Sequence, residues 1–324
     1  MNTERQLRDD EISDEGLFTG TARLKPHPEA ANPVLTRDDI TDASATFVAD
    51  PFVVYNRGVY DMFFEIKDSG GEVYIGHAFS EDGLKYEYNQ TVLAPEVAQH
   101  TYPHVFRYDG EWIMVPSPGA NVNGQFRVYV ADDYPTEWRL VATPIPDRVR
   151  QDPTPILWDG TWYLIYQDTD SMDIVLAYAD SLTDSGWQTH PASPIFRNDR
   201  DAIEQCSIGG AEMVPSGRPV YHDDSVDIFY RSHINTELYQ YRITELSTER
   251  FKQQEVGERP VFAKIDRQQW NRRFMHTLNP VYPWRCSDDI IAVDGLEADN
   301  YRYSIGIYTT DTSIDSPNSA QQNQ

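Results

Sequence analysis

The sequence predicts an all-β fold, a five-bladed β-propeller, in a single domain that spans residues 16 to 310. Three observations predict this fold. A β-hairpin pattern recurs five times, the intervals between the hairpin turns suit four-stranded blades, and no segment has the pattern of a long amphipathic helix. A β-sandwich is the competing fold, and the regular phase of the repeat makes it the weaker choice.

Each hairpin consists of two runs of β-type residues around a short turn. The five copies lie at residues 52–64, 104–115, 155–166, 219–230 and 290–308. The second turn residues are at positions 58, 110, 160, 224 and 295, which gives intervals of 52, 50, 64 and 71 residues. The first two intervals suit one blade with its connections, and the two longer ones require inserted loops.

The remaining strands and the chain ends follow from the same pattern. Third strands are expected at residues 74–80, 128–132 and 174–180, and Tyr86, Trp138 and Trp187 open the outer strands. Residues 1 to 15 and 311 to 324 lack apolar periodicity and are expected to be disordered. Cys206 and Cys286 lie far apart and have no metal-type spacing, so we expect two reduced thiols.

The charge of the chain excludes several classes of partner. Asp and Glu number 52 against 27 Lys and Arg, a formal net charge of -25. Such a surface repels phosphate backbones and anionic lipid, so neither nucleic acid nor membrane is expected as a partner. The charged N-terminus and the lack of a long apolar run predict a cytoplasmic protein. Because lysine occurs at only five positions, we interpret the acidity as adaptation to concentrated salt.

The repeat also predicts which side chains face the central channel. The position eight residues before the second turn residue is occupied by Asp50, Tyr102, Asp152, Ser216 and Ser287. The two aspartates each begin an Asp-Pro dipeptide, and the proline stiffens the entry to the strand. A strand-entry turn would explain one Asp-Pro, but two in phase predict a functional pair. Two carboxylates that face each other can divide the acid and base roles of glycosidic bond cleavage.

Short motifs in the expected order resemble a known group of enzymes. They are Ala49-Asp50-Pro51-Phe52, His100-Thr101-Tyr102-Pro103, Asp152-Pro153-Thr154 and His276-Thr277-Leu278-Asn279. This set resembles the five-bladed propellers of glycoside hydrolase family 43 and its relatives in families 32, 62 and 68. Ser216-Gly217-Arg218-Pro219-Val220 resembles the blade-4 opening of a branch that includes the N-terminal domain of glucosamine inositolphosphorylceramide transferases. The resemblance covers residues 45 to 310.

The resemblance implies roles for the acidic residues. Asp50 corresponds to the base that activates water, and Asp152 to the carboxylate that orients the acid and raises its pKa. The third member should be a glutamate that opens blade 4, but Ser216 occupies that position. Glu212 is the first candidate for the acid and Glu204 the second. The third alternative is that the usual acid is absent.

The other candidate residues are expected to bind substrate. They are His100, Tyr102, Arg218 and His276. Arg218 either holds a ligand through its planar guanidinium or forms a salt bridge to Asp152 or Asp50. No cofactor is expected and no metal-ligand spacing is present; the resemblance implies at most a structural Ca²⁺-like ion beside the channel histidines.

Two functions follow, from different classes. The first is a glycoside hydrolase-like propeller that acts on a carbohydrate in its channel, with Asp50 as general base and Asp152 as second carboxylate. The alternative is a non-catalytic sugar- or glycolipid-recognition domain without the blade-4 acid. A scaffold that binds protein through its rim is a weaker third. In each of the first two the partner is a carbohydrate.

Overall fold

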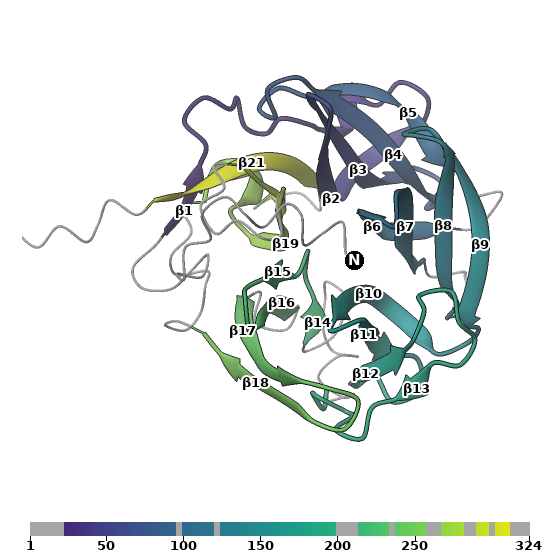
Figure 1. Cartoon of the computed structure of the whole chain (residues 1–324). Coiled ribbons are helices and arrows are strands. Elements are labelled where there is room, and N and C mark those ends of the chain that lie inside the picture. The colour runs from purple at the N-terminus through teal and green to yellow at the C-terminus, as the bar shows by residue number, and fades with distance from the viewer. Residues whose placement is uncertain are drawn as a thin grey trace, which may run out of the picture.

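The computed structural model describes residues 23–94, 99–119, 124–198, 213–232, 237–256, 267–281, 290–297 and 302–311. Its strands form five antiparallel sheets arranged as the blades of a propeller (Figure 1). Within these ranges, no helix is long and apolar enough to cross a membrane. The expectations for Glu204, Glu212, Ser287, both cysteines, residues 1–15 and nearly all of the tail fall outside the described residues.

The sheets follow one another along the chain. Blades 1 and 2 consist of β2 (Ala45–Asn56), β3 (Val59–Asp68), β4 (Val73–Ser80), β5 (Glu87–Leu93), β6 (His100–Tyr108), β7 (Glu111–Pro118), β8 (Phe126–Asp133) and β9 (Glu137–Ile145). Blades 3 and 4 consist of β10 (Val149–Trp158), β11 (Thr161–Asp168), β12 (Ile174–Ala179), β13 (Gln188–Thr189), β14 (Val214–Pro215), β15 (Val220–Tyr221), β16 (Val226–Ser232), β17 (Glu237–Leu246) and β18 (Phe251–Glu255). Blade 5 consists of β19 (Phe274–Pro280), β20 (Ile291–Leu296), β21 (Tyr303–Asp311) and β1 (Arg23–Pro26). The described helices are two short 3-10 segments, η2 (Arg37–Asp39) and η4 (Gln269–Asn271).

The hairpin turns of blades 1 to 3 have the geometry that the sequence predicts. Arg57-Gly58, Asp109-Gly110 and Asp159-Gly160 all have positive φ at both residues. This is the conformation of a type I′ turn, whose twist matches that of the strands it joins. Glycine at the second position takes the more extreme φ without strain. The inner hairpins predicted for the first three blades are confirmed.

A bulge recurs at the same point of the inner strand in these three blades. The register of β2, β6 and β10 shifts at Asp50, Tyr102 and Asp152, whose φ angles are 52°, 46° and 51°. A bulge bends the strand and changes the direction of a side chain. The proline that follows each residue fits there because a bulge leaves one backbone position without a ladder hydrogen bond. The repeat phase therefore placed three channel residues correctly.

Blade 5 differs from the prediction. Residues 290–295, expected to form its inner strand, form β20, the second strand, and the inner strand is β19. Asp294-Gly295 lies within β20 rather than at a turn. Gly295 is needed there because a Cβ would lie 2.1 Å from Cβ of Asn271 in η4. Close packing rather than a turn explains this glycine, and the error moved the predicted fifth channel position to Ser287.

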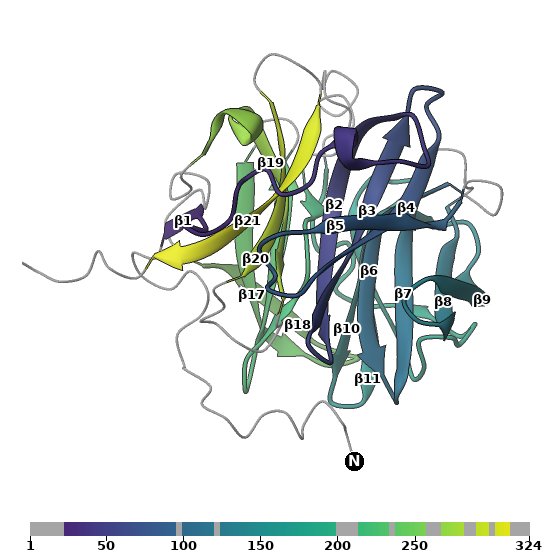
Figure 2. The ribbon, with the colours of Figure 1, turned by 90° about the horizontal axis from the view of Figure 1, so that it is seen from above.

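The first described strand closes the ring. β1 pairs with β21 as the outermost strand of blade 5 (Figure 2). Just after it, the Asn32 amide accepts a hydrogen bond from Ile307 N at 2.7 Å and donates one to Ile307 O at 2.7 Å. The apolar clusters lie between neighbouring blades; one of them joins β7 and β8 to β11 and β12. Blade-to-blade packing thus holds the inner strands in place.

Candidate functional site

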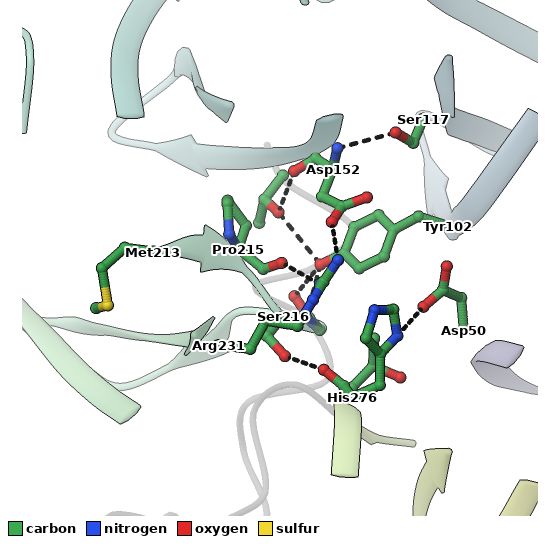
Figure 3. A network of polar contacts seen from close by, with 12 residues as sticks. Asp50, Tyr102, Ser117, Asp152, Met213, Pro215, Ser216, Arg231 and His276 are labelled. Atoms are coloured by element: carbon green, nitrogen blue, oxygen red, sulfur yellow. Dashed lines mark hydrogen bonds and ion pairs between the residues drawn. The ribbon is translucent and has the colours of Figure 1, made fainter. Parts of the chain in front are cut away.

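Inner residues of several blades come together near the centre of the propeller. Figure 3 shows Asp50 of blade 1, Asp152 of blade 3 and His276 of blade 5 around the side chain of Arg231 from blade 4. Asp50 and Asp152 are each 2% exposed and Arg231 is 1% exposed. Charged groups are almost never buried to this extent unless they are paired. The pairings therefore decide what the site can do.

Asp152 is paired with Arg231. Its Oδ2 lies 2.6 Å from Nη2 of Arg231, and its backbone N–H donates to Ser117 Oγ at 2.9 Å. Arg231 also donates through Nη1 to the carbonyl of Pro215 at 2.8 Å. Burial raises the pKa of Asp152, and the guanidinium of Arg231 opposes that shift. One oxygen of this carboxylate is thus occupied by a fixed cation.

His276 lies between two aspartates. Its Nδ1 is 2.9 Å from Asp50 Oδ1 and 3.1 Å from Asp294 Oδ2. Asp294, on β20, also accepts hydrogen bonds from the backbone and the hydroxyl of Thr277 and from Asp50 N. Burial and Arg231 disfavour the protonated imidazole, but Asp294 and Asp50 outweigh them and raise the pKa of His276 to about 9. His276 is therefore an imidazolium at neutral pH.

A second carboxyl group lies beside Asp50. Glu65 of β3 is 8% exposed, and its carboxyl interacts with that of Asp50. Burial and the charge of Asp50 raise the pKa of Glu65 well above its ordinary value. Burial opposes the ionisation of Asp50, but His276 and Arg231 lead the groups that together lower the pKa of Asp50. Asp50 therefore ionises at a lower pH than Glu65 does.

Tyr102 lies between Asp152 and Asp50 in Figure 3 and contacts blade 4. Its hydroxyl donates to Gly217 O at 2.9 Å and accepts from Gly217 N at 2.6 Å. Blade 3 separates Tyr102 in blade 2 from Gly217 in blade 4, so this contact spans the ring. The ring packs edge-on against Phe52 at 4.8 Å and is fully buried. These contacts fit a structural role for Tyr102, and its binding of substrate stays a prediction.

His100 and Arg218 also form internal contacts. His100 is fully buried, its Nε2 lies 2.8 Å from the Tyr129 hydroxyl, and burial followed by the charge of Arg127 lowers its pKa to about 4. Arg218 is 4% exposed and donates to the carbonyls of Val105 at 3.0 Å and Val281 at 2.9 Å. The cation found at Asp152 is Arg231, where the sequence pointed to Arg218. Of the four predicted binding residues, His276 makes a direct contact with a predicted aspartate, Asp50, and Tyr102 lies near Asp152 (Figure 3).

Sequence reasoning missed Arg231, Glu65 and Asp294. All three lie on the second strands of their blades, which are β16, β3 and β20. The repeat phase was defined for the innermost strands, so it did not predict these residues. The available signal was a charged residue inside an apolar run, as in Phe63-Phe64-Glu65-Ile66 and Ile228-Phe229-Tyr230-Arg231. A charge at a buried strand position requires a partner.

Within the described ranges, Asp50, His276 and Asp294 bring their carboxylate and imidazole atoms within 4.8 Å of one another. Calcium prefers about six to eight oxygen ligands. Here one of the three groups is an imidazole, and its nitrogen toward both carboxylates carries a proton at neutral pH. This donor set suits a shared proton better than the Ca²⁺-like ion that the resemblance implied.

Comparisons with known proteins agree with the propeller fold. Residues 23–295 match the family described as glucosamine inositolphosphorylceramide transferase 1, N-terminal. No curated protein sequence matches the chain.

Several solved structures are similar to the chain. An α-L-arabinofuranosidase from Podospora anserina, in complex with cellotriose, shares 11% identity with a TM-score of 0.65, over 92% of this chain and 99% of that chain. The catalytic domain of a family 62 α-L-arabinofuranosidase from Coprinopsis cinerea shares 11% identity with a TM-score of 0.64, over 90% and 97%. A family 117 glycoside hydrolase from Zobellia galactanivorans shares 14% identity with a TM-score of 0.59, over 94% of each chain. Identities this low show a glycoside hydrolase-like propeller fold and leave the activity to the site.

Proposed function

The chain belongs to the family described as glucosamine inositolphosphorylceramide transferase 1, N-terminal, and from that premise we propose that its propeller binds the sugar portion of a glycan or glycolipid in the channel. The single observation that carries this proposal is the pairing of Asp152 with Arg231 at 2.6 Å. It favours recognition over hydrolysis for the following reasons.

Glycoside hydrolysis needs a protonated carboxyl at the leaving-group oxygen and a second carboxylate about 5 Å or more away. Among the described residues, the channel carboxyls are engaged with other protein groups. Asp152 Oδ2 accepts a hydrogen bond from Arg231 at 2.6 Å, and the Glu65 carboxyl interacts with that of Asp50, which favours recognition over acid catalysis. These groups are suited to accept hydrogen bonds from sugar hydroxyls in fixed directions.

The charge of the site limits the ligand. Three aspartates, Asp50, Asp152 and Asp294, face the two cations Arg231 and His276. With a chain charge of -25, this balance favours a neutral or cationic sugar over an anionic one. The family description names glucosamine, so amino sugars are the first ligands to test.

Titration calorimetry in concentrated salt tests the proposal, with glucosamine, N-acetylglucosamine, inositol and arabinose as ligands. We expect Asp50→Asn to weaken binding at least tenfold, because the amide replaces an acceptor with a donor. Asp132→Asn, at a carboxylate whose side chain is half exposed, is the matched control and should bind as the wild type does. If none of these sugars binds, or if Asp50→Asn binds normally while folded, carbohydrate recognition in the channel is refuted.

Hydrolysis is the second candidate, and the ionised state of Asp50 favours it. The lowered pKa of Asp50 keeps this carboxylate ionised, which is the state that a general base requires. In this alternative Asp152 is the second carboxylate and Glu212, outside the described residues, is the acid. Arabino-, xylo- and fructo-configured model substrates, assayed in high salt, test it. Turnover that is lost in both Asp50→Asn and Glu212→Gln would establish hydrolysis; no turnover would exclude it for these substrates.

A further inference from the structure

We propose that Ser216 is a positioning residue of the channel, whose hydroxyl fixes the backbone of His276 and thereby the place of its imidazole. The imidazole lies between the carboxylates of Asp50 and Asp294. The family description gives this serine no role, and the sequence pattern marks it only as the place where the expected glutamate acid is missing. The role deepens the proposed function, because it concerns the same site.

The strand that carries His276 leaves part of its backbone outside the sheet ladder. The register between β19 and β20 shifts around residues 276–277, and such a bulge interrupts the ladder hydrogen bonds. The backbone N–H of Thr277 donates instead to the Asp294 carboxylate at 2.7 Å. The carbonyl of His276 accepts from the Ser216 hydroxyl at 2.5 Å (Figure 3). Side chains thus supply the partners that the bulge removes.

The backbone of Ser216 is itself fixed from two sides. Its N–H donates to the carbonyl of Phe229 in β16 at 2.9 Å, and its carbonyl accepts from Leu278 N in β19 at 3.1 Å. The next residue, Gly217, forms a parallel bridge with Leu278. The Ser216 side chain is fully buried. A hydroxyl on a backbone that both blades anchor can hold its acceptor in one place.

Adjacent residues of this segment hold the two cations of the site. The Pro215 carbonyl accepts a hydrogen bond from Nη1 of Arg231 at 2.8 Å. The next residue, Ser216, binds the backbone of His276. The separation of the two cations is therefore set by the end of β14 and the residue that follows it.

Small movements of the imidazole matter because its partners are close. Nδ1 of His276 lies 2.9 Å from Asp50 Oδ1 and 3.1 Å from Asp294 Oδ2, and the attraction between charges weakens as they separate. Without the Ser216 hydroxyl the carbonyl is no longer held, so the ring can move away from both carboxylates. The other ionisable groups that act on the imidazole come from blades 1, 3 and 4: Glu65, Asp152 and Arg231.

NMR titration of the His276 ring tests the role without any ligand, and its signal is the one absent from His276→Asn. In Ser216→Ala we expect the His276 pKa, about 9 in the wild type, to fall by about one unit or more toward its ordinary value. Ser216→Thr keeps the hydroxyl and should titrate as the wild type does. Ser216→Cys, close to serine in size but a weak donor, should give a smaller fall and replaces the alanine variant if that does not fold.

Ser117→Ala is the matched control. Ser117 is also fully buried, and its hydroxyl also binds a backbone group, the N–H of Asp152 at 2.9 Å. This variant should leave the His276 titration unchanged even where stability falls. The proposal is overturned if the His276 pKa is unchanged in the folded alanine or cysteine variant of Ser216. It is equally overturned if Ser216→Thr or Ser117→Ala lowers that pKa as much as Ser216→Ala does.

The pH profile of ligand binding tests the consequence for the site, and this measurement rests on the proposed function. N-acetylglucosamine is the probe, because it carries no titrating amine. The alkaline limb of its binding should move to lower pH in Ser216→Ala by the same amount as the His276 pKa, and Ser216→Thr should restore it. Superimposable limbs in the wild type and the folded alanine variant would refute positioning. Because the NMR titration needs no sugar, a failure of carbohydrate binding leaves the role of Ser216 independently decided.

Discussion

Arg231 and Asp152 form a buried ion pair that joins blade 4 to blade 3 at the centre of the propeller, with Nη2 and Oδ2 2.6 Å apart. The cation comes from the second strand of its blade and the carboxylate from the bulge of the first strand of the other. A pair this deeply buried is costly to break, because the remaining charge cannot be solvated.

Replacing Arg231 by methionine should therefore destabilise the fold by about 3 to 5 kcal/mol. Arg139→Met is the matched control: Arg139 pairs with Asp132 at 3.0 Å, but the side chains are 58% and 50% exposed. Loss of this exposed ion pair should lower the free energy of unfolding by at most about 1 kcal/mol. Denaturant unfolding measures both values, and comparable costs for the two variants would contradict the argument.

The stability of the protein should fall as the pH rises through the range in which His276 titrates. The pKa of His276 is raised from its ordinary value near 6.5 to about 9. Its contribution, on the order of 3 kcal/mol, is thus complete below pH 6.5 and is lost as the pH approaches and passes 9.

Asparagine at position 276 keeps an N–H donor near the place of Nδ1 but does not titrate. The unfolding free energy of His276→Asn should decline less between pH 6.5 and 9 than that of the wild type. His27→Asn, at a partly exposed histidine, should follow the wild type. Parallel pH curves for wild type and His276→Asn would show that His276 is not an imidazolium in the folded protein.

Alanine at Gly217 should be among the most damaging small substitutions in the chain. Gly217 has φ +126°, and a Cβ would lie 1.9 Å from the carbonyl oxygen of Leu278 in blade 5. The same residue binds the Tyr102 hydroxyl through its backbone. We expect a loss of about 4 kcal/mol or more.

Gly110→Ala provides the comparison for that variant. Gly110 also has positive φ, +85°, but nothing lies within 4 Å of the Cβ position. Its cost should be limited to backbone strain of about 1 to 2 kcal/mol. If thermal unfolding gives the two alanine variants equal losses, the contact with Leu278 is not the cause.

Added salt should stabilise the protein. The net charge of -25 creates self-repulsion, which is screened as the Debye length falls from about 10 Å at 0.1 M to about 3 Å at 1 M. The melting temperature in sodium chloride should rise steeply at first and level off near 1 M. A flat or falling curve over this range would remove the interpretation of the acidity as salt adaptation.

The sequence predicted the fold because turns and strand phase are local properties. The Asp-Gly turns of blades 2 and 3 and the bulges at Asp50 and Asp152 recur with a fixed spacing, and each is specified by adjacent residues. The prediction for blade 5 was wrong because local patterns do not reveal contacts between distant residues. Gly295 is explained by its contact with Asn271, which lies 24 residues earlier and which no local pattern predicts.

The site was predicted only in part, because pairing is not local. Asp152 and Arg231 are separated by 79 residues, and the sequence offered Arg218 as an equally reasonable cation. Glu65 lies on a second strand, whose phase relative to the channel the repeat does not define. Asp50, Asp152 and His276 were found from phase and motif, whereas the groups that set their charge states required the assembled ring.

The closure of the ring by β1 determines when the molecule can finish folding. Arg23 pairs with Asp311 and Pro26 with Tyr308, so the last blade needs residues from the two ends of the described chain. Contacts between such distant residues form slowly, because a long loop must close before they contribute any stabilisation. On the ribosome, four blades can assemble while the chain is still being made, but blade 5 must wait for its outermost pair. The Asn32 amide, which binds both backbone groups of Ile307, is placed to hold that late strand once it arrives.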